Sequence, residues 1–218
     1  MKMENVLIFG DSYSTFEGFV PSGYACYYPD EEPMRTNVLE VSQTWWYQVL
    51  QKLDAKLVQN NSWSGSTVCH TGYEGRDCSK INSFVYRLEQ LIADGFFQKN
   101  KIDTVFIFGG TNDSWANSPV GSLKFADWSR EDLYCILPAV CYFIKTLKEQ
   151  LPNAKIVCIV NDILKAEIAD GIEVACRQYG VESVRLVDVD KNSGHPTVKG
   201  MAQISAQVLD AVLSASVI

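Results

Sequence analysis

The chain has 218 residues, of which 47% are hydrophobic and 21% charged, and this composition is typical of a soluble globular protein. Its net charge of -7 argues against a nucleic-acid or anionic-membrane surface, because phosphate binding needs clustered Lys and Arg. We therefore expect a single domain over residues 1–218 with a small-molecule partner, no nucleic acid and no membrane.

No apolar stretch in the sequence is typical of a secretory signal or long enough for a membrane span. The seven cysteines are an odd number, and four of them fall inside predicted helices or strands, where a free thiol packs as a small apolar residue. Both observations favour a cytoplasmic protein.

Five apolar runs bounded by turn residues predict strands, at 5–9, 56–60, 103–108, 155–160 and 183–187. Several are almost entirely Val, Ile, Leu and Phe, as in parallel strands covered on both faces. Helical patterns alternate with them, at 44–53, 79–95, 129–150, 163–179 and 197–214. This alternation predicts an α/β fold, a three-layer α/β/α sandwich with right-handed crossovers.

The helix predicted from residue 129 carries two local signals. Ser129 is expected to cap its start, and Pro138 predicts a kink or a later start. Two long connections, 13–43 and 111–128, show no clear period and are expected to be functional. Together with 61–79 they should form the rim of one cleft at the carboxyl ends of the strands.

Gly10-Asp11-Ser12 follows the first predicted strand, which places Ser12 where open α/β sheets hold their active sites. A serine hydroxyl becomes a good nucleophile only when a base takes its proton. His195 is the natural candidate for that base, because the other histidine of the chain is His70. The plainer interpretation is that Ser12 and His195 are capping or surface residues.

Asn112 follows the third predicted strand through two glycines, so its amide can point over the sheet and donate to a developing oxyanion. The backbone N–H groups of Gly65 and Ser12 could donate to the same oxygen. An Asx-turn at Asn112 and an ordinary turn at Gly65 are the plainer alternatives.

The ordered set Gly10-Asp11-Ser12, Gly65, Gly110-Thr111-Asn112-Asp113 and His195-Pro196 resembles the four blocks of the SGNH hydrolases, the GDSL-type esterase and lipase superfamily. The resemblance extends over nearly the whole chain. It implies a flavodoxin-like sandwich with a five-stranded parallel sheet, and ester hydrolysis without a cofactor or metal. It implies these roles: nucleophile Ser12, general base His195, and an oxyanion hole formed by Ser12, Gly65 and Asn112, with Asp11 as a local structural residue.

The chain departs from this pattern where family members usually carry an aspartate three residues before the histidine, since that position is Asn192. An amide oxygen can accept the imidazole N–H, but it supports a charged imidazolium less well. Asp190, in the same loop, is the favoured alternative and completes the predicted catalytic set. A backbone carbonyl or an acid from Asp30-Glu31-Glu32 are further candidates.

Cys69, His70 and Cys78 lie close together in sequence, but their spacing matches no common zinc pattern. Ordinary packing is the expectation, with a disulfide or a metal site as alternatives.

The sequence therefore predicts a serine esterase for short-acyl esters such as acetyl, with an acylated sugar as a possible substrate because tryptophans occur in the predicted rim. The alternatives are a catalytically silent ligand- or partner-binding domain and a lipase or thioesterase of the same fold. A nucleotide or phosphate binder is less well supported, because the glycine-rich loop lacks the lysine of a P-loop.

Overall fold

A computed structural model of the chain describes residues 4–29 and 36–214. Its main sheet contains five parallel strands: β1 (Asn5–Gly10), β2 (Lys56–Ser62), β3 (Thr104–Phe108), β4 (Lys155–Val160) and β5 (Glu182–Arg185). The strand order is β2-β1-β3-β4-β5. This is the flavodoxin-like order, and it confirms the predicted five-stranded parallel sheet.

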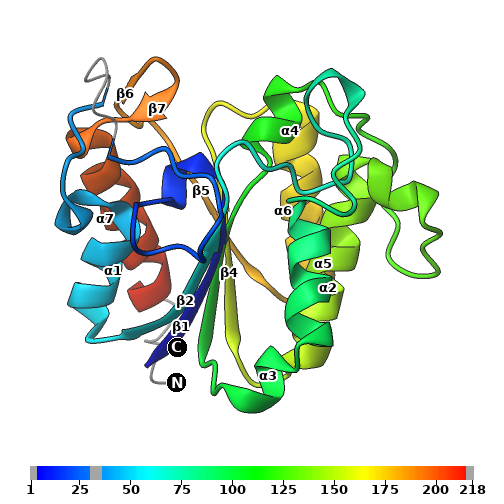
Figure 1. Cartoon of the computed structure of the whole chain (residues 1–218), viewed down its shortest axis with the longest axis horizontal. Coiled ribbons are helices and arrows are strands. Elements are labelled where there is room, and N and C mark those ends of the chain that lie inside the picture. The colour runs from blue at the N-terminus through cyan, green and yellow to red at the C-terminus, as the bar shows by residue number, and fades with distance from the viewer. Residues whose placement is uncertain (1–3, 30–35, 215–218) are drawn as a thin grey trace.

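Helices cover both faces of the sheet (Figure 1). One face packs against α1 (Trp45–Leu53) and α7 (Val198–Ser214). The other packs against α2 (Phe84–Ala93), α5 (Ile136–Gln150) and α6 (Ala166–Tyr179). Each face has its own buried hydrophobic cluster, so the predicted three-layer α/β/α sandwich is confirmed.

The chain reverses its direction of sheet growth at β1, which lies between β2 and β3. Loops that leave neighbouring strands at such a switch point diverge to opposite faces of the sheet and leave a crevice at the carboxyl ends. Ser12 follows β1 and Asn112 follows β3, so both residues reach this crevice.

The helices differ from the prediction in their bounds and in their number. The helix expected from residue 79 begins at Phe84, because the hydroxyl of Ser83 caps it by accepting the N–H of Tyr86. Two short helices, α3 (Phe96–Lys99) and α4 (Thr111–Trp115), were not predicted, and α4 lies in a connection expected to be a loop.

The segment after Ser129 shows why capping signals alone do not set a helix length. The hydroxyl of Ser129 accepts the N–H of Asp132 in the short 3-10 turn η4 (Glu131–Tyr134), and α5 starts afterwards at Ile136. Pro138 then lies in the first turn of α5, where a backbone N–H has no intrahelical acceptor. The later start is therefore the correct alternative.

Within the described residues, none of the helices combines the length and the apolar character that crossing a membrane requires.

Candidate active site

Ser12 lies in a single 3-10 turn, η1 (Ser12–Ser14), directly beyond the end of β1. Asp11 caps this turn, since its carboxylate accepts the N–H of Tyr13 at 3.0 Å. The Asp11 side chain is fully buried, and burial raises its pKa to about 7. Gly10 allows the close approach of the turn to the sheet, because a Cβ there would lie 2.5 Å from the side chains of Ser14 and Ser62.

His195 reaches Ser12 from the opposite end of the chain. Its Nε2 lies 2.9 Å from Ser12 Oγ, within hydrogen-bond distance. His195 begins β7 (His195–Pro196), which pairs with β6 (Lys191–Asn192) in a small hairpin. Both turn residues of the hairpin, Ser193 and Gly194, have positive φ (49° and 80°), as a two-residue type I′ turn requires.

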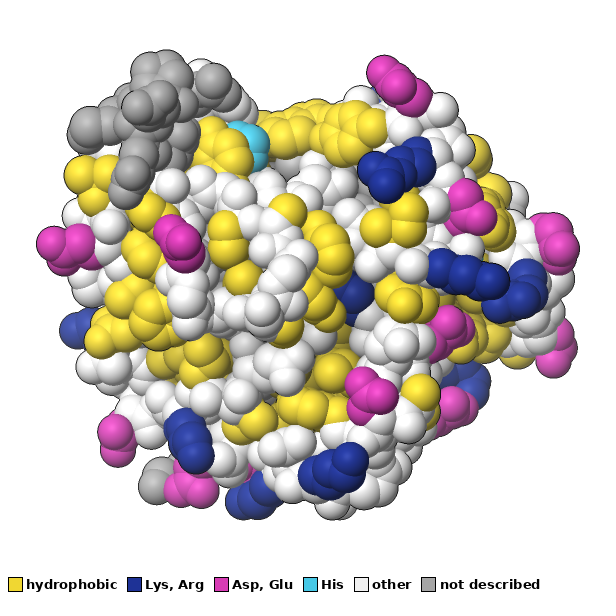
Figure 2. All heavy atoms as spheres, viewed as in Figure 1, with side chains coloured by type: hydrophobic (Ala, Val, Ile, Leu, Met, Phe, Trp, Pro, Cys, Tyr) yellow, Lys and Arg dark blue, Asp and Glu magenta, His cyan; other side chains and the backbone are white. Residues whose placement is uncertain are grey.

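Aromatic side chains hold the imidazole of His195. Tyr27 stacks on it with ring centroids 3.6 Å apart, and Trp115 meets it edge to face at 5.6 Å. The hydroxyl of Tyr13 donates to the carbonyl of Gly194 and so ties the hairpin to the Ser12 turn. In Figure 2, hydrophobic side chains likewise flank a histidine at the upper edge of the molecule, the edge toward which the parallel strands point.

The residues considered for orienting His195 occupy different places. The carboxylate of Asp190 accepts the hydroxyl of Thr197, and the side chain of Asn192 is exposed. The carbonyl of Ser193 lies 3.4 Å from His195 Nδ1. The acids at 30–32 fall outside the described residues. Within the described residues, the backbone carbonyl of Ser193 is therefore one candidate that the hairpin places beside the ring.

Asn112 lies in the first turn of α4, over the crevice. Its Nδ2 donates to the carbonyl of Ser66 at 3.0 Å, and its Oδ1 accepts the hydroxyl of Tyr73 at 2.7 Å. These two bonds fix which way the amide points and leave the second N–H of Nδ2 for another acceptor. Gly65 is exposed in the neighbouring loop with φ of 78°, a conformation that favours glycine.

Two buried charges support the loop that carries Gly65. The carboxylate of Asp113 accepts the N–H groups of Val68 and Cys69, at 2.8 and 3.1 Å. Burial raises the pKa of Asp113 to about 6, while these hydrogen bonds act in the opposite direction. Arg87, from α2, donates from Nη2 to the carbonyl of Gly10 and to Ser66 Oγ, at 3.2 and 3.1 Å.

Sequence reasoning missed both Arg87 and Tyr73. Arg87 is 1% exposed, and its position on the apolar face of a predicted helix was a signal that could have been used. Its guanidinium lies 4.4 Å from the ring of Phe84. Tyr73 lies in a loop without periodicity, so nothing in the sequence pointed to its contact with Asn112.

Cys69 and Cys78 are free and buried, so the disulfide alternative is wrong. Among the described residues there is no group of three metal-ligating side chains. His70, between them in sequence, is 6% exposed, and its Nδ1 lies 2.9 Å from Ser83 Oγ. These residues pack against the start of α2.

His70 should make the protein less stable in acid. Burial lowers its pKa from 6.5 to about 4, with Arg130 acting in the same direction and Asp77 against it. In the unfolded chain His70 becomes protonated below about pH 6.5, whereas in the folded chain it stays neutral down to about pH 4. The free energy of unfolding therefore falls as the pH is lowered through this window. At about 1.4 kcal/mol per pKa unit, the loss reaches at most about 3 kcal/mol.

The variant His70→Asn, whose amide can keep the contact with Ser83, should lack this loss. Urea unfolding of both proteins between pH 4 and 7 gives the difference in their free energies of unfolding at each pH. The pH dependence that Asp11 and Asp113 contribute has the opposite sign and is common to both proteins, so it cancels in this difference. Parallel stability curves for the two proteins would contradict the prediction.

The strand order defines a flavodoxin-like α/β/α sandwich, and the contact between Ser12 and His195 places a candidate hydrolase site at its β1/β3 switch point. A sequence model of the GDSL-like lipase/acylhydrolase family matches residues 4–212. The chain belongs to this family, within the SGNH hydrolase superfamily, as the sequence resemblance predicted.

Solved structures agree with this assignment. A candidate GDSL-like lipase from Bacteroides ovatus is 38% identical with a TM-score of 0.89, and the match covers 98% of this chain and 100% of that chain. One from Bacteroides uniformis is 43% identical with a TM-score of 0.88, over 97% and 96% of the two chains.

An acetyl xylan esterase from Butyrivibrio proteoclasticus is 18% identical with a TM-score of 0.63, over 99% of this chain and 64% of that chain, and it shares the fold. A search of curated proteins found no match.

Proposed function

We propose that the protein is a serine esterase that removes a short acyl group, such as acetyl, from a carbohydrate through an acyl-enzyme. The observation that carries the proposal is the 2.9 Å contact between Ser12 Oγ and His195 Nε2, beside the amide of Asn112. Family membership supports hydrolase chemistry. The acetyl xylan esterase among the structural neighbours and the exposed side chains of Trp115 and Tyr73 support a carbohydrate ester.

The chemistry follows from these positions. His195 Nε2 takes the proton of Ser12 Oγ as that oxygen bonds to the ester carbonyl carbon. The carbonyl oxygen gains negative charge and accepts N–H groups from Asn112, Gly65 and Ser12. His195 then gives its proton to the leaving alcohol as the C–O bond breaks. Water repeats the sequence on the acyl-enzyme, with His195 again as base, and releases the carboxylic acid.

A fluorophosphonate probe tests the nucleophile directly. We expect a single adduct, located on Ser12 by mass spectrometry of the peptides, because only an activated serine displaces fluoride from phosphorus. The variant Ser12→Ala should not be labelled, whereas Ser64→Ala, changed in a neighbouring loop, should be labelled as the unchanged protein is. An unlabelled protein, or an adduct on another residue, would remove Ser12 from the mechanism.

Replacing Asn112 by alanine should lower kcat about 10²- to 10³-fold, the usual effect of losing one oxyanion donor. Tyr73→Phe removes only the hydroxyl that holds the Asn112 amide, so we expect a smaller loss of kcat, about tenfold, with KM little changed. Steady-state kinetics on p-nitrophenyl acetate measures both, with Tyr47→Phe in α1 as the control. A Tyr73→Phe enzyme with full kcat would show that the amide keeps its orientation without this bond.

We further propose that the Ser193 carbonyl, rather than Asp190, helps to orient the imidazole. Asp190→Asn should then lower kcat less than about tenfold, since the carboxylate contacts Thr197. A fall of about 10⁴-fold, the size associated with losing a triad carboxylate, would instead assign Asp190 to the catalytic set. The same kinetic assay distinguishes the two outcomes.

A further inference from the structure

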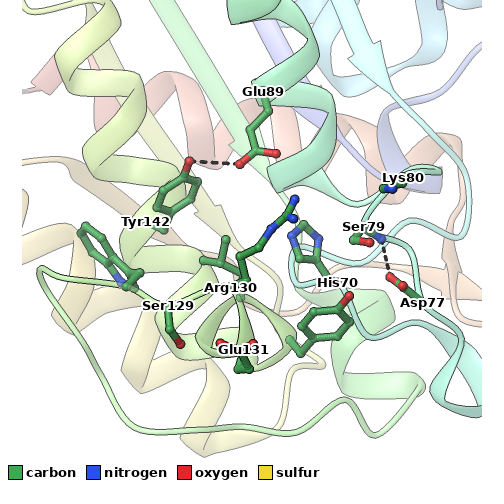
Figure 3. Close-up of a pocket in the computed structure, with 12 residues that line it drawn as sticks. His70, Asp77, Ser79, Lys80, Glu89, Ser129, Arg130, Glu131 and Tyr142 are labelled. Atoms are coloured by element: carbon green, nitrogen blue, oxygen red, sulfur yellow. Dashed lines mark hydrogen bonds between the residues drawn. The ribbon is translucent and has the colours of Figure 1, made fainter.

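A cavity of about 450 Å³ lies in the part of the molecule formed by α2, α5 and the segments at 70–80 and 128–134, and Ser12, Asn112 and His195 are not among its lining residues. The loop that carries Gly65 and Tyr73 also forms one wall of this cavity, through His70, Asp77, Ser79 and Lys80. Glu89 of α2 and Tyr142 of α5 line it from the helices, and the 128–134 segment forms the opposite wall (Figure 3). Its volume lies within the range of about 300 to 1,000 Å³ that small-molecule sites occupy.

The aromatic walls of this cavity are held in place by contacts of their own. Trp128 donates its indole N–H to the carbonyl of Lys124 at 2.8 Å, and its ring meets Tyr142 edge to face at 5.6 Å. The hydroxyl of Tyr142 donates to Glu89 Oε1 at 3.1 Å. Tyr134 packs edge to face on His70, at 5.3 Å. A ligand would therefore meet a largely preformed site, which lowers the entropy cost of binding.

The polar groups that face the cavity include both donors and acceptors. Glu89 and Arg130 point toward one another across it in Figure 3. In the described part of the chain, the Arg130 guanidinium makes no hydrogen bond or ion pair, so its planar set of donors remains open. His70 is neutral at pH 7, because burial lowers its pKa to about 4.

Charges of both signs line the cavity: the cations are Lys80 and Arg130, and the anions are Asp77, Glu89 and Glu131. A strongly anionic or cationic ligand would gain from one set and be repelled by the other. A neutral polyhydroxylated ring can donate to the carboxylates, accept from the guanidinium and place its C–H faces on the aromatic side chains.

From this combination we infer that the cavity is a binding site for a neutral sugar unit of an oligosaccharide, separate from the ester-cleaving site. The inference holds whether or not Ser12 is a nucleophile. If the protein does act on acylated carbohydrate, this site would hold an unmodified part of the same chain.

Isothermal titration calorimetry with cellohexaose and xylohexaose, which carry no acyl group, tests the site. We expect saturable binding of at least one of them. Arg130→Ala and Glu89→Gln should each weaken it about tenfold, the effect of losing a hydrogen bond to a charged group. Arg76→Ala is the control, because Arg76 is an exposed arginine next to the cavity-lining residue Asp77 and does not itself line the cavity.

Turnover of p-nitrophenyl acetate should be unchanged in Arg130→Ala, which separates this site from the catalytic one. Thermal melting checks that each variant is folded. Three results would overturn the inference: no binding of either neutral oligosaccharide, binding that Arg130→Ala leaves unchanged, or binding confined to an acidic probe such as an oligogalacturonate. Loss of ester hydrolysis in Ser12→Ala with oligosaccharide binding intact would support both assignments independently.

Discussion

Ser12→Ala is expected to lower kcat for p-nitrophenyl acetate by about four orders of magnitude or more, because the variant has no oxygen to form the acyl-enzyme. Ser12 is 2% exposed and lies beside Asp11 in a tight turn, so loss of one hydroxyl should leave the fold intact. Steady-state kinetics measures the loss, and circular dichroism checks the fold. Ser64→Ala serves as the control and should retain full activity.

The double variant Ser12→Ala/His195→Gln sharpens this prediction. If His195 acts by taking the Ser12 proton, the two side chains work as one unit and their effects are not additive. The double variant should therefore be no slower than Ser12→Ala alone. A further large fall in the double variant would mean that His195 contributes by another route, such as activating water directly. Full activity in Ser12→Ala would remove the acyl-enzyme altogether.

Local sequence patterns could predict that the candidate residues Ser12 and Asn112 lie near one another, because of where parallel strands end. The carboxyl ends of β1 and β3 meet at one edge of the sheet, so a serine after one and an asparagine after the other must converge. The position of His195 could not be predicted from strand ends, since it belongs to a hairpin more than 180 residues from Ser12. The His195-Pro196 motif was what made it a candidate. Each of these residues directly follows or belongs to a recognisable local element.

The supporting contacts could not be predicted in the same way, because they join segments with no local relation. Tyr73 meets Asn112 across 39 residues and a loop with no periodic pattern. Asp190 is near His195 in sequence, yet its carboxylate turns to Thr197 at the start of α7. Closeness in sequence did not reveal this contact of Asp190 with Thr197. Arg87 differs, because its charge on an apolar helix face was a local signal that could have been used.

Arg87 is the second residue whose replacement should have a large effect, in this case on stability. Its guanidinium is buried beneath the catalytic loops, where it donates to the carbonyls of Asn61, Asn82 and Gly10. Burial lowers its pKa to about 9, with the charge of Asp11 acting in the opposite direction, so the group remains protonated at neutral pH. One side chain thus joins the end of β1, the end of β2 and the start of α2.

Arg87→Met keeps most of the side-chain volume but leaves these carbonyls without donors and Asp11 without a nearby cation. We expect it to lower the free energy of unfolding by about 3 to 5 kcal/mol, the size associated with removing one buried charge from its partners. For a chain of this length, that corresponds to a fall in Tm of roughly 10 °C or more. Urea unfolding and thermal melting measure it, with Arg177→Met on the exposed face of α6 as the matched control.

Arg87→Lys separates charge from geometry. A lysine restores a cation near Asp11 but cannot donate to Asn61, Gly10 and Ser66 at once, because it lacks the planar fork. We expect intermediate stability and a reduced kcat, since Ser66 also accepts the Asn112 amide through its carbonyl. If Arg87→Met were as stable as the unchanged protein, the Arg87 side chain would contribute to stability only through its packed volume, and not through its charge or hydrogen bonds. The loops around Ser12 would then be held by Asp11 and Asp113 without it.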